Sequence, residues 1–348
     1  MLVAIFALIA ALFVLSLYSE RLPRHYHTVL FALIVVAMTV MCIVRPTSYN
    51  SDFLNYEKFF FGFDQDILKL LVEPTYLWIS RTVYYAGGSI YTVLAIYAIL
   101  SVPLKLYALR KLTDPTLFLL AACVYAGNYF MLHDCEQIRI AVALTFGMYA
   151  VYLKWRGNWL WIAFVLFGIA FHHTLAVLAA PIIVAPREIR GWWWWLYCAV
   201  VPFGILLWIT HISVLVFLPI PYIETRIQAY EIAMAQGQHP DIRVINALVI
   251  ARVAIYYYLI YYYDVVKRHV KALPILLLCY GASLFAWFGL TDMVVIAVRL
   301  SQLFGFVEVI LFASLAYTVR PRWAGKVIVV LLSLYQFAQL CISNQFDW

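Results

Sequence analysis

Arg139 is the residue of this sequence whose chemistry most clearly calls for a partner. It stands at the start of an apolar helix, at the end of residues 133–139, whose sequence is HDCEQIR. A guanidinium stays charged at physiological pH and is costly to place near hydrocarbon, so such an arginine usually binds an anion or pairs with an acid. The alternative for Arg139 is that its side chain extends to the lipid headgroups and binds no specific partner. Arg139 and the neighbouring Gln137 are therefore candidates for binding an anionic substrate.

Two further arginines, Arg299 and Arg252, are predicted at a similar depth. Arg299 lies near the outer end of an apolar stretch, with Gln302 about one turn further along the same face, and Arg252 is expected roughly 8–12 Å below the outer surface. A pair with Asp292 would explain Arg299 without a ligand, and a buried pair with an acid would explain Arg252. Three guanidiniums near one leaflet boundary repel one another unless an anion lies among them. Because their planar donors match phosphate bidentately, a lipid-linked pyrophosphate is the anion we expect there.

His172 and His173 are adjacent at a point where the chain is expected to turn. One of them could act as a general base near neutral pH, where imidazole titrates. A buried histidine that merely completes the local structure is the alternative. No third ligand stands at metal-ligand spacing, so a zinc site is not expected. The six cysteines form no CxxC pair, which argues against a disulfide framework or a thiolate metal site, and no cofactor is expected.

Acidic and polar residues precede these helices on the same side. Asp52, Asn55 and Tyr56 place a carboxylate, an amide and a phenol close together, which is the inventory that sugar hydroxyls require. Glu73 stands where a proline indicates that a helix begins, so capping and the helix dipole would also explain it. Arg81 lies in that helix. We expect Asp52 and Glu73 to supply carboxylates to the site and Arg81 to contact substrate.

The composition indicates the environment of these residues. The chain has 348 residues, 66% of them hydrophobic and 12% charged, and its mean hydropathy is +0.91. No soluble domain could bury so much apolar surface, so an integral membrane protein is indicated. The first apolar run, residues 2–18, lacks a basic leader and a cleavage motif, which predicts a retained helix rather than a signal peptide.

The distribution of charge predicts the orientation in the membrane. Lysine and arginine gather in short loops, which the positive-inside rule places in the cytoplasm. The intervening segments 45–75, 133–139 and 210–243 are together acidic and are predicted to face outward. The net charge of +7 is thus explained by the basic loops that orient the protein in the membrane, and no nucleic-acid partner is expected. The basic groups are Arg21/Arg24, Lys105/Arg110/Lys111, Lys154/Arg156, Arg187/Arg190, Lys267/Arg268/Lys271 and Arg320/Arg322/Lys326.

These features predict an all-α polytopic integral membrane protein, a single transmembrane domain over residues 1–348 with about ten spanning helices. Residues 159–185 do not fit a single span, because both flanks are basic. We favour a re-entrant hairpin of two half-helices that turns at His172 and His173, whereas a single span would invert the topology of everything after it. A GT-C-like architecture is compatible with this layout. The expected spans lie near 2–18, 28–44, 90–109, 116–132, 138–153, 192–209, 244–263, 273–290, 294–319 and 327–343, with both termini outside.

Two external segments, 45–75 and 210–243, are long enough to shape a site at the outer face. The first carries the acidic residues named above. The second contains a helical stretch, residues 223–231, which we expect to lie on the membrane surface as a lid over the spans.

Five short motifs occur in order over most of the chain. They are Asp52-Phe53-Leu54-Asn55-Tyr56, Glu73-Pro74-Thr75-Tyr76, Gln137-Ile138-Arg139-Ile140-Ala141, Phe171-His172-His173-Thr174-Leu175-Ala176 and Arg299-Leu300-Ser301-Gln302-Leu303-Phe304. With these motifs the chain resembles the EpsG-type family of bacterial surface-polysaccharide polymerases, a branch of the Wzy-like O-antigen and exopolysaccharide polymerases. Each motif is weak alone. Leu175 departs from the small residue usual in the family's histidine motif, and by that alignment His172 is the matching histidine.

The resemblance implies a glycosyltransferase of the bacterial inner membrane whose active site faces the periplasm. It would transfer a growing chain between undecaprenyl-pyrophosphate-linked oligosaccharides, with lipid pyrophosphate leaving and no obligatory metal. Arg139 and Arg299, assisted by Arg252, are expected to stabilise the leaving group. His172 is the first candidate for the general base, followed by Glu73 and Asp52. The remaining substrate-binding candidates are Gln137, His173, Tyr56, Asn55, Tyr76, Gln302 and Arg81.

Other activities and partners stay open. An O-antigen ligase would use related substrates, as would a transferase of single sugars from polyprenyl phosphate, although the latter usually carries its carboxylates in the loop after the first span. Here that loop, residues 20–27, is short and cytoplasmic. A transporter or flippase would place its polar groups at the midplane and show paired repeats. Membrane lipid surrounds the protein, and whether a polysaccharide chain-length regulator docks on it is not decided by the sequence.

Overall fold

The computed structural model describes residues 1–45, 52–65, 72–212 and 243–342, and these residues form helices and no strand. The all-α class predicted from the sequence is therefore confirmed. The predicted lid helix, residues 223–231, lies outside the described residues.

The helices cluster into two compact units. The first comprises Met1–Ile182, Asp264–Ala272 and Glu308–Trp348, and the second comprises Ile183–Tyr263 and Leu273–Val307. The grouping of both units into one domain stays a prediction.

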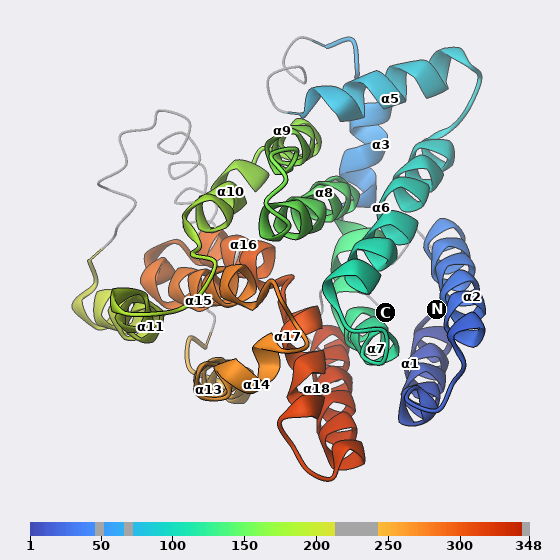
Figure 1. Cartoon of the computed structure of the whole chain (residues 1–348). Helices are drawn as coiled ribbons and strands as arrows, with labels where there is room; N and C mark the ends of the chain where they lie inside the picture. Colours follow the sequence, from blue (N-terminus) through green and yellow to red (C-terminus); the bar gives the residue numbers. More distant parts are fainter. Residues whose placement is uncertain (46–51, 66–71, 213–242, 343–348) are drawn as a thin grey trace. The chain divides into compact units, whose positions relative to one another are not determined.

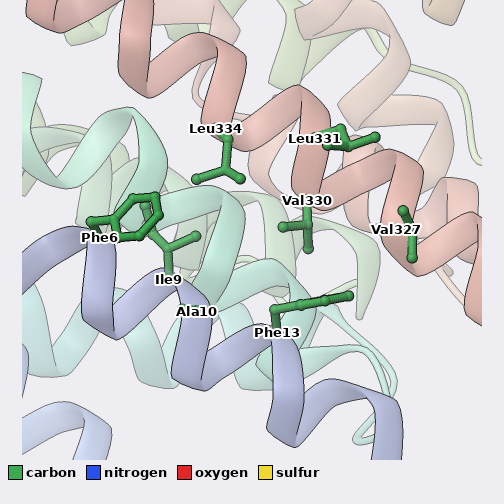
Figure 2. A pocket seen from close by; sticks show the side chains of 8 residues that line it. All are labelled: Phe6, Ile9, Ala10, Phe13, Val327, Val330, Leu331 and Leu334. Atoms are coloured by element: carbon green, nitrogen blue, oxygen red, sulfur yellow. The ribbon is translucent and has the colours of Figure 1, made fainter.

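In the first unit, α6 (Ile90–Leu112) packs against α2 (Arg24–Ile43) and α8 (Ile138–Trp155), while α7 (Phe118–Gly127) packs against α1 (Leu2–Tyr18) (Figure 1). The other helices here are α3 (Phe53–Phe61), α5 (Pro74–Tyr85), the π-helix η2 (Phe130–Glu136), α9 (Trp161–Phe171), α10 (Leu175–Val184), α17 (Glu308–Ser314), η5 (Leu315–Tyr317) and α18 (Arg322–Ile342). Of these, α10 ends just beyond the boundary of the unit. Helix α18 packs on α7, and an apolar groove of about 190 Å³ runs between α1 and α18 (Figure 2).

In the second unit, α15 (Leu273–Gly289) is the central helix. It packs against α11 (Trp192–Thr210), α16 (Val294–Gly305) and α13 (Ala247–Tyr261). The short helix η4 (Thr291–Met293) lies between α15 and α16, whereas α14 (Tyr263–Lys267), which follows α13, belongs to the first unit from Asp264 onward.

Five described helices are long and apolar enough to cross a membrane: α2, α6, α8, α11 and α18. They become six if α16 and residues 308–317 form one broken span, and six shorter apolar helices of 10–17 residues accompany them. The polytopic membrane class is thus confirmed, while the count of about ten spans stays a prediction. The predicted span 116–132 is divided into α7 and η2.

Helix α9 runs antiparallel along α8. Phe171 at its end stacks on Phe146 of α8, with ring centroids 5.6 Å apart, whereas Phe164 contacts Tyr149 at 5.4 Å nearer the end of α8. Helix α10 begins at Leu175. The helix break predicted at the two histidines is therefore present.

The prediction that Lys105 belongs to a short cytoplasmic loop is wrong, whereas the external position of residues 133–139 stays a prediction. Lys105 lies within α6, and its Nζ is 2.7 Å from Oδ2 of Asp134 in η2, with both side chains at most 5% exposed. The positive-inside rule counts charges that face water. This lysine is neutralised inside the protein instead, so it carries no information about orientation.

Candidate functional site

A buried carboxylate, that of Glu73, is the centre of the candidate site. Glu73 immediately precedes Pro74, whose fixed φ favours the first position of a helix, and α5 begins there. The Glu73 side chain makes no capping hydrogen bond to α5, so capping does not explain its position. Glu73 is only 5% exposed. A carboxylate buried to this extent requires charged or hydrogen-bonding partners.

Arg139 is the first of these partners. It lies in the first turn of α8, and its Nη1 donates a hydrogen bond to Glu73 Oε2 within an ion pair. The Arg139 side chain is 20% exposed. Its Nε is buried and has no hydrogen-bond partner among the described residues. The arginine is thus held by Glu73 while one of its donors remains unused.

Two aromatic rings of α3 flank the Arg139 guanidinium. Its carbon is 5.7 Å from the ring centroid of Tyr56 and equally far from that of Phe59, within the range of cation–π attraction. The hydroxyl of Tyr76 in α5 donates to the Tyr56 carbonyl oxygen at 2.8 Å and fixes α3 against α5. Burial raises the pKa of the Tyr56 hydroxyl, which therefore stays protonated and uncharged. Helix α3 thus contacts the guanidinium that Glu73 holds by its ion pair.

Helix α9 brings two imidazoles to the same carboxylate. Thr75, in the first turn of α5, donates from Oγ1 to the carbonyl oxygen of Ala170 at 2.7 Å and ties the two helices together. Nδ1 of His172 lies 3.8 Å from Glu73 Oε1, and Nδ1 of His173 lies 3.9 Å from the same oxygen. Both distances are too long for direct hydrogen bonds, and an imidazole would be attracted to the carboxylate as a charge only when it is protonated. The side chains of His172 and His173 are 23% and 55% exposed, so solvent reaches both.

The other predicted residues lie elsewhere in the first unit or in the second unit. Asn55 and Arg81 are exposed, and Arg81 lies 5.8 Å from the ring centroid of a tyrosine one turn away. Asp52 is half-buried at the start of α3, and Gln137 is half-buried at the start of α8. Gln302 is half-buried in α16. The roles expected for these residues stay predictions.

The second unit contains the other two predicted arginines. Arg252 of α13 is 8% exposed and donates from Nη2 to Ser283 Oγ at 2.8 Å and from Nη1 to Ser301 Oγ at 3.4 Å. Arg299 of α16 is exposed. Because these residues and Arg139 belong to different units, their convergence on one anion stays a prediction.

A buried polar cluster around Asp134 is missing from the predicted site. The Asp134 carboxylate accepts hydrogen bonds from Ser101, from Lys105 at 2.7 and 2.8 Å and from the Tyr125 hydroxyl at 2.6 Å. It lies in η2, shortly before Arg139, and π-helical turns occur frequently at functional sites. The signal available in the sequence was Lys105 itself, a charge inside a continuous apolar stretch, which requires an internal partner.

The chemistry gathered here is that of one carboxylate, two imidazoles and one guanidinium. The described residues contain no group of three His, Cys, Asp or Glu side chains that could hold a metal ion. The carboxylate and imidazoles can exchange a proton with a hydroxyl group, and the guanidinium can donate hydrogen bonds to anionic oxygen. Such a set suits the transfer of a group to a hydroxyl with departure of an anion.

A family model described as the EpsG family matches residues 28–345 of the chain. The match therefore includes Glu73, Arg139 and His172 together with both units. No curated protein and no solved structure matches the chain.

Proposed function

Since this chain belongs to the EpsG family, whose members are Wzy-like polysaccharide polymerases, we propose that it polymerises undecaprenyl-pyrophosphate-linked oligosaccharide repeat units. The reaction takes place at the periplasmic face of the bacterial inner membrane. The protein acts as a glycosyltransferase that moves the growing chain from its lipid carrier to a sugar hydroxyl of the next lipid-linked unit.

The contacts of Glu73 are the observation that carries this proposal. One of its oxygens accepts from Arg139, and the other faces His172 and His173 at 3.8 and 3.9 Å. The three elements that supply these groups meet at the start of α8. The opposite end of α8 carries Lys154, which the positive-inside rule assigns to the cytoplasm. The proposed periplasmic position of the site is consistent with that orientation.

The group transfer requires a base and stabilisation of a leaving anion. The acceptor hydroxyl oxygen bonds to the anomeric carbon of the growing chain, and the bond from that carbon to the pyrophosphate oxygen breaks. The bonding electron pair departs with the lipid pyrophosphate. The hydroxyl proton passes to the pair formed by Glu73 and His172. All of these steps use side chains of the chain itself.

The ion pair between Glu73 and Arg139 suits a leaving group that gains charge. While Glu73 is ionised, it neutralises Arg139. When Glu73 takes part in accepting the hydroxyl proton, its negative charge falls as the pyrophosphate oxygen becomes more negative. The guanidinium then attracts the leaving group more strongly than it attracted the substrate, which is the differential binding that lowers a barrier. Arg252 and Arg299 remain proposed further contacts to the same anion.

The proposal is tested with purified full-length protein in lipid vesicles supplied with synthetic lipid-pyrophosphate repeat units, in the presence and absence of a chelator. Separation of the products by size should give a ladder of polymers that persists with the chelator. Unchanged single units would refute the proposed activity. Transfer of whole units to a different lipid acceptor, with no ladder, would indicate a ligase instead. Adding a chain-length regulator of the same polysaccharide system should narrow the distribution of the ladder if the two proteins associate.

A further inference from the structure

The hydrogen bonds of His172 decide which of its ring nitrogens carries the proton. The backbone N–H of Thr174 donates to His172 Nδ1 at 3.3 Å, and Oγ1 of Thr174 lies 2.8 Å from the same nitrogen. A ring nitrogen that accepts from an N–H group has its lone pair in the ring plane and carries no hydrogen. In a neutral imidazole the proton is then on Nε2. The local chain thus selects one tautomer of His172.

This selection is built into the helix break. The first N–H groups of a helix have no acceptor within the helix and must find one elsewhere. Thr174 immediately precedes α10, and His172 Nδ1 supplies the acceptor for its N–H. The turn is fixed further by the N–H of Leu175, which donates to the His172 carbonyl oxygen at 3.0 Å. The contact between Thr174 and His172 therefore depends on neighbouring residues and not on a distant element.

We propose that Thr174 holds His172 as an Nε2–H donor to an oxygen of the lipid-linked saccharide, and that Glu73 takes the proton of the acceptor hydroxyl. This inference rests on the function proposed above and assigns the roles within that site. The acceptor oxygen bonds to the anomeric carbon, and its proton moves to Glu73 Oε1. The bond between the anomeric carbon and the pyrophosphate oxygen breaks, and the electron pair leaves with lipid pyrophosphate.

The two oxygens of Glu73 support this assignment. Oε2 accepts from Arg139, whereas Oε1 lies 3.8 and 3.9 Å from the histidine nitrogens, beyond hydrogen-bond distance. Oε1 can therefore accept a proton from a hydroxyl. If His172 took the proton at Nδ1 instead, the new N–H would oppose the N–H of Thr174. Nε2 already carries its proton in the selected tautomer, so His172 is better placed to donate than to accept.

Two amide substitutions of His172 separate these roles. In His172→Gln the amide nitrogen reaches about as far as Nε2, so a donor is kept without an acid–base group. In His172→Asn the amide oxygen replaces Nδ1 and continues to accept from Thr174, but nothing reaches the position of Nε2. We expect polymerisation by His172→Gln to stay within about tenfold of wild type and that by His172→Asn to fall by about 100-fold or more, as for loss of one preorganised donor.

Thermal unfolding of every variant shows whether the protein is folded. Thr174→Val tests whether the backbone N–H alone sets the tautomer of His172, because it removes Oγ1 but keeps the backbone donor. If the backbone N–H is sufficient, its rate stays within a few fold of wild type, and a collapse of activity in the folded variant would overturn the assignment. Equal losses in His172→Gln and His172→Asn, with both proteins folded, would overturn the donor role and favour His172 as the base.

The tautomer is also measured without any activity. The chain has eight histidines, and ring-nitrogen NMR of histidine-labelled protein in vesicles assigns His172 as the signal that His172→Gln removes. Protonated Nε2 with unprotonated Nδ1 supports the proposal, and the reverse overturns it. If wild-type protein makes no polymer, the proposed function fails while this spectrum still decides the tautomer.

The oxygen that meets Nε2 belongs either to pyrophosphate or to sugar, and product inhibition distinguishes the two sources. Undecaprenyl pyrophosphate without a saccharide should inhibit His172→Asn more weakly than His172→Gln if Nε2–H binds the pyrophosphate. Equal inhibition of the two variants, combined with a raised KM for the saccharide-bearing substrate in His172→Asn, assigns the bond to sugar. Equal inhibition with no difference in KM would contradict contact between His172 and the saccharide.

Discussion

Nη1 of Arg139 donates to Oε2 of Glu73, and this ion pair joins the start of α8 to the start of α5. The Glu73 side chain is 6% exposed and that of Arg139 is 20% exposed, so neither charge is fully screened by water. Removing one member of a buried pair strands the other charge, which costs far more than the pair itself contributes. The pair therefore couples the packing of α5 against α8 to the chemistry of the site.

The first prediction concerns folding. Glu73→Ala should lower the free energy of unfolding by about 3 kcal/mol, near the lower end of the range for a broken buried pair because Arg139 is partly exposed. Adding Arg139→Met removes the stranded charge and should recover part of that loss. Denaturant unfolding of the two single variants and the double variant in detergent measures the coupling. Strictly additive losses would show that the two side chains do not interact.

The second prediction concerns the shape of the Arg139 side chain. Arg139→Lys keeps the positive charge but loses the planar donor fork and the ring contacts with Tyr56 and Phe59. We expect polymerisation to fall by about 100-fold. Arg190→Lys is the matched control, because Arg190 is 83% exposed, pairs with Glu188 and is not one of the residues that contact Glu73. Wild-type rates in Arg139→Lys would mean that charge alone suffices.

The third prediction concerns the cluster in η2. Asp134→Asn and Lys105→Met each leave a buried charge without its partner and should destabilise the protein by about 3–5 kcal/mol. The double variant should lose less than the sum of the two, and comparison of all three proteins gives the coupling energy. If each single variant unfolds like wild type, the cluster contributes nothing to stability and the contact between Lys105 and Asp134 is dispensable.

The fourth prediction concerns the close approach of α9 to α10. A Cβ at Gly168 would clash with Leu175 Cδ2 and would lie 3.1 Å from the carbonyl oxygen of Ala143. Gly168→Ala should therefore destabilise the protein by about 1–3 kcal/mol through overpacking. Leu175→Ala added to it removes the nearer clash and should restore part of the stability. A thermal scan that shows no difference between wild type and Gly168→Ala would contradict this packing.

Helices α5, α9 and α10 illustrate what the sequence could predict. Two adjacent histidines between basic flanks predicted the break between α9 and α10, because a single span would have placed basic residues on the wrong side. Glu73 before a proline predicted the start of α5. In both cases the signal is local, since the residues that decide the structure are neighbours in the chain.

Contacts between segments that are distant in the sequence were harder to predict. The placement of Lys105 failed because a count of basic residues treats every charge as facing water, whereas Lys105 meets Asp134 inside the protein. The role of Tyr56 in binding sugar stays a prediction, but the sequence did not predict its burial or the contact of its ring with the guanidinium of Arg139. The position of a residue along a predicted helix gives its depth but not the neighbour that its side chain meets. These partners could therefore be identified only from the three-dimensional structure.

The most direct test of the account compares Glu73→Gln with Glu57→Gln in the vesicle polymerisation assay. Both changes remove one carboxylate, but Glu57 of α3 is not one of the residues assigned to the candidate site, and the new amide at Glu73 can still accept from Arg139. The account predicts a loss of at least about 100-fold in polymer formation for Glu73→Gln, in keeping with removal of a base, and a normal ladder for Glu57→Gln. A normal ladder from folded Glu73→Gln would contradict the account at its centre.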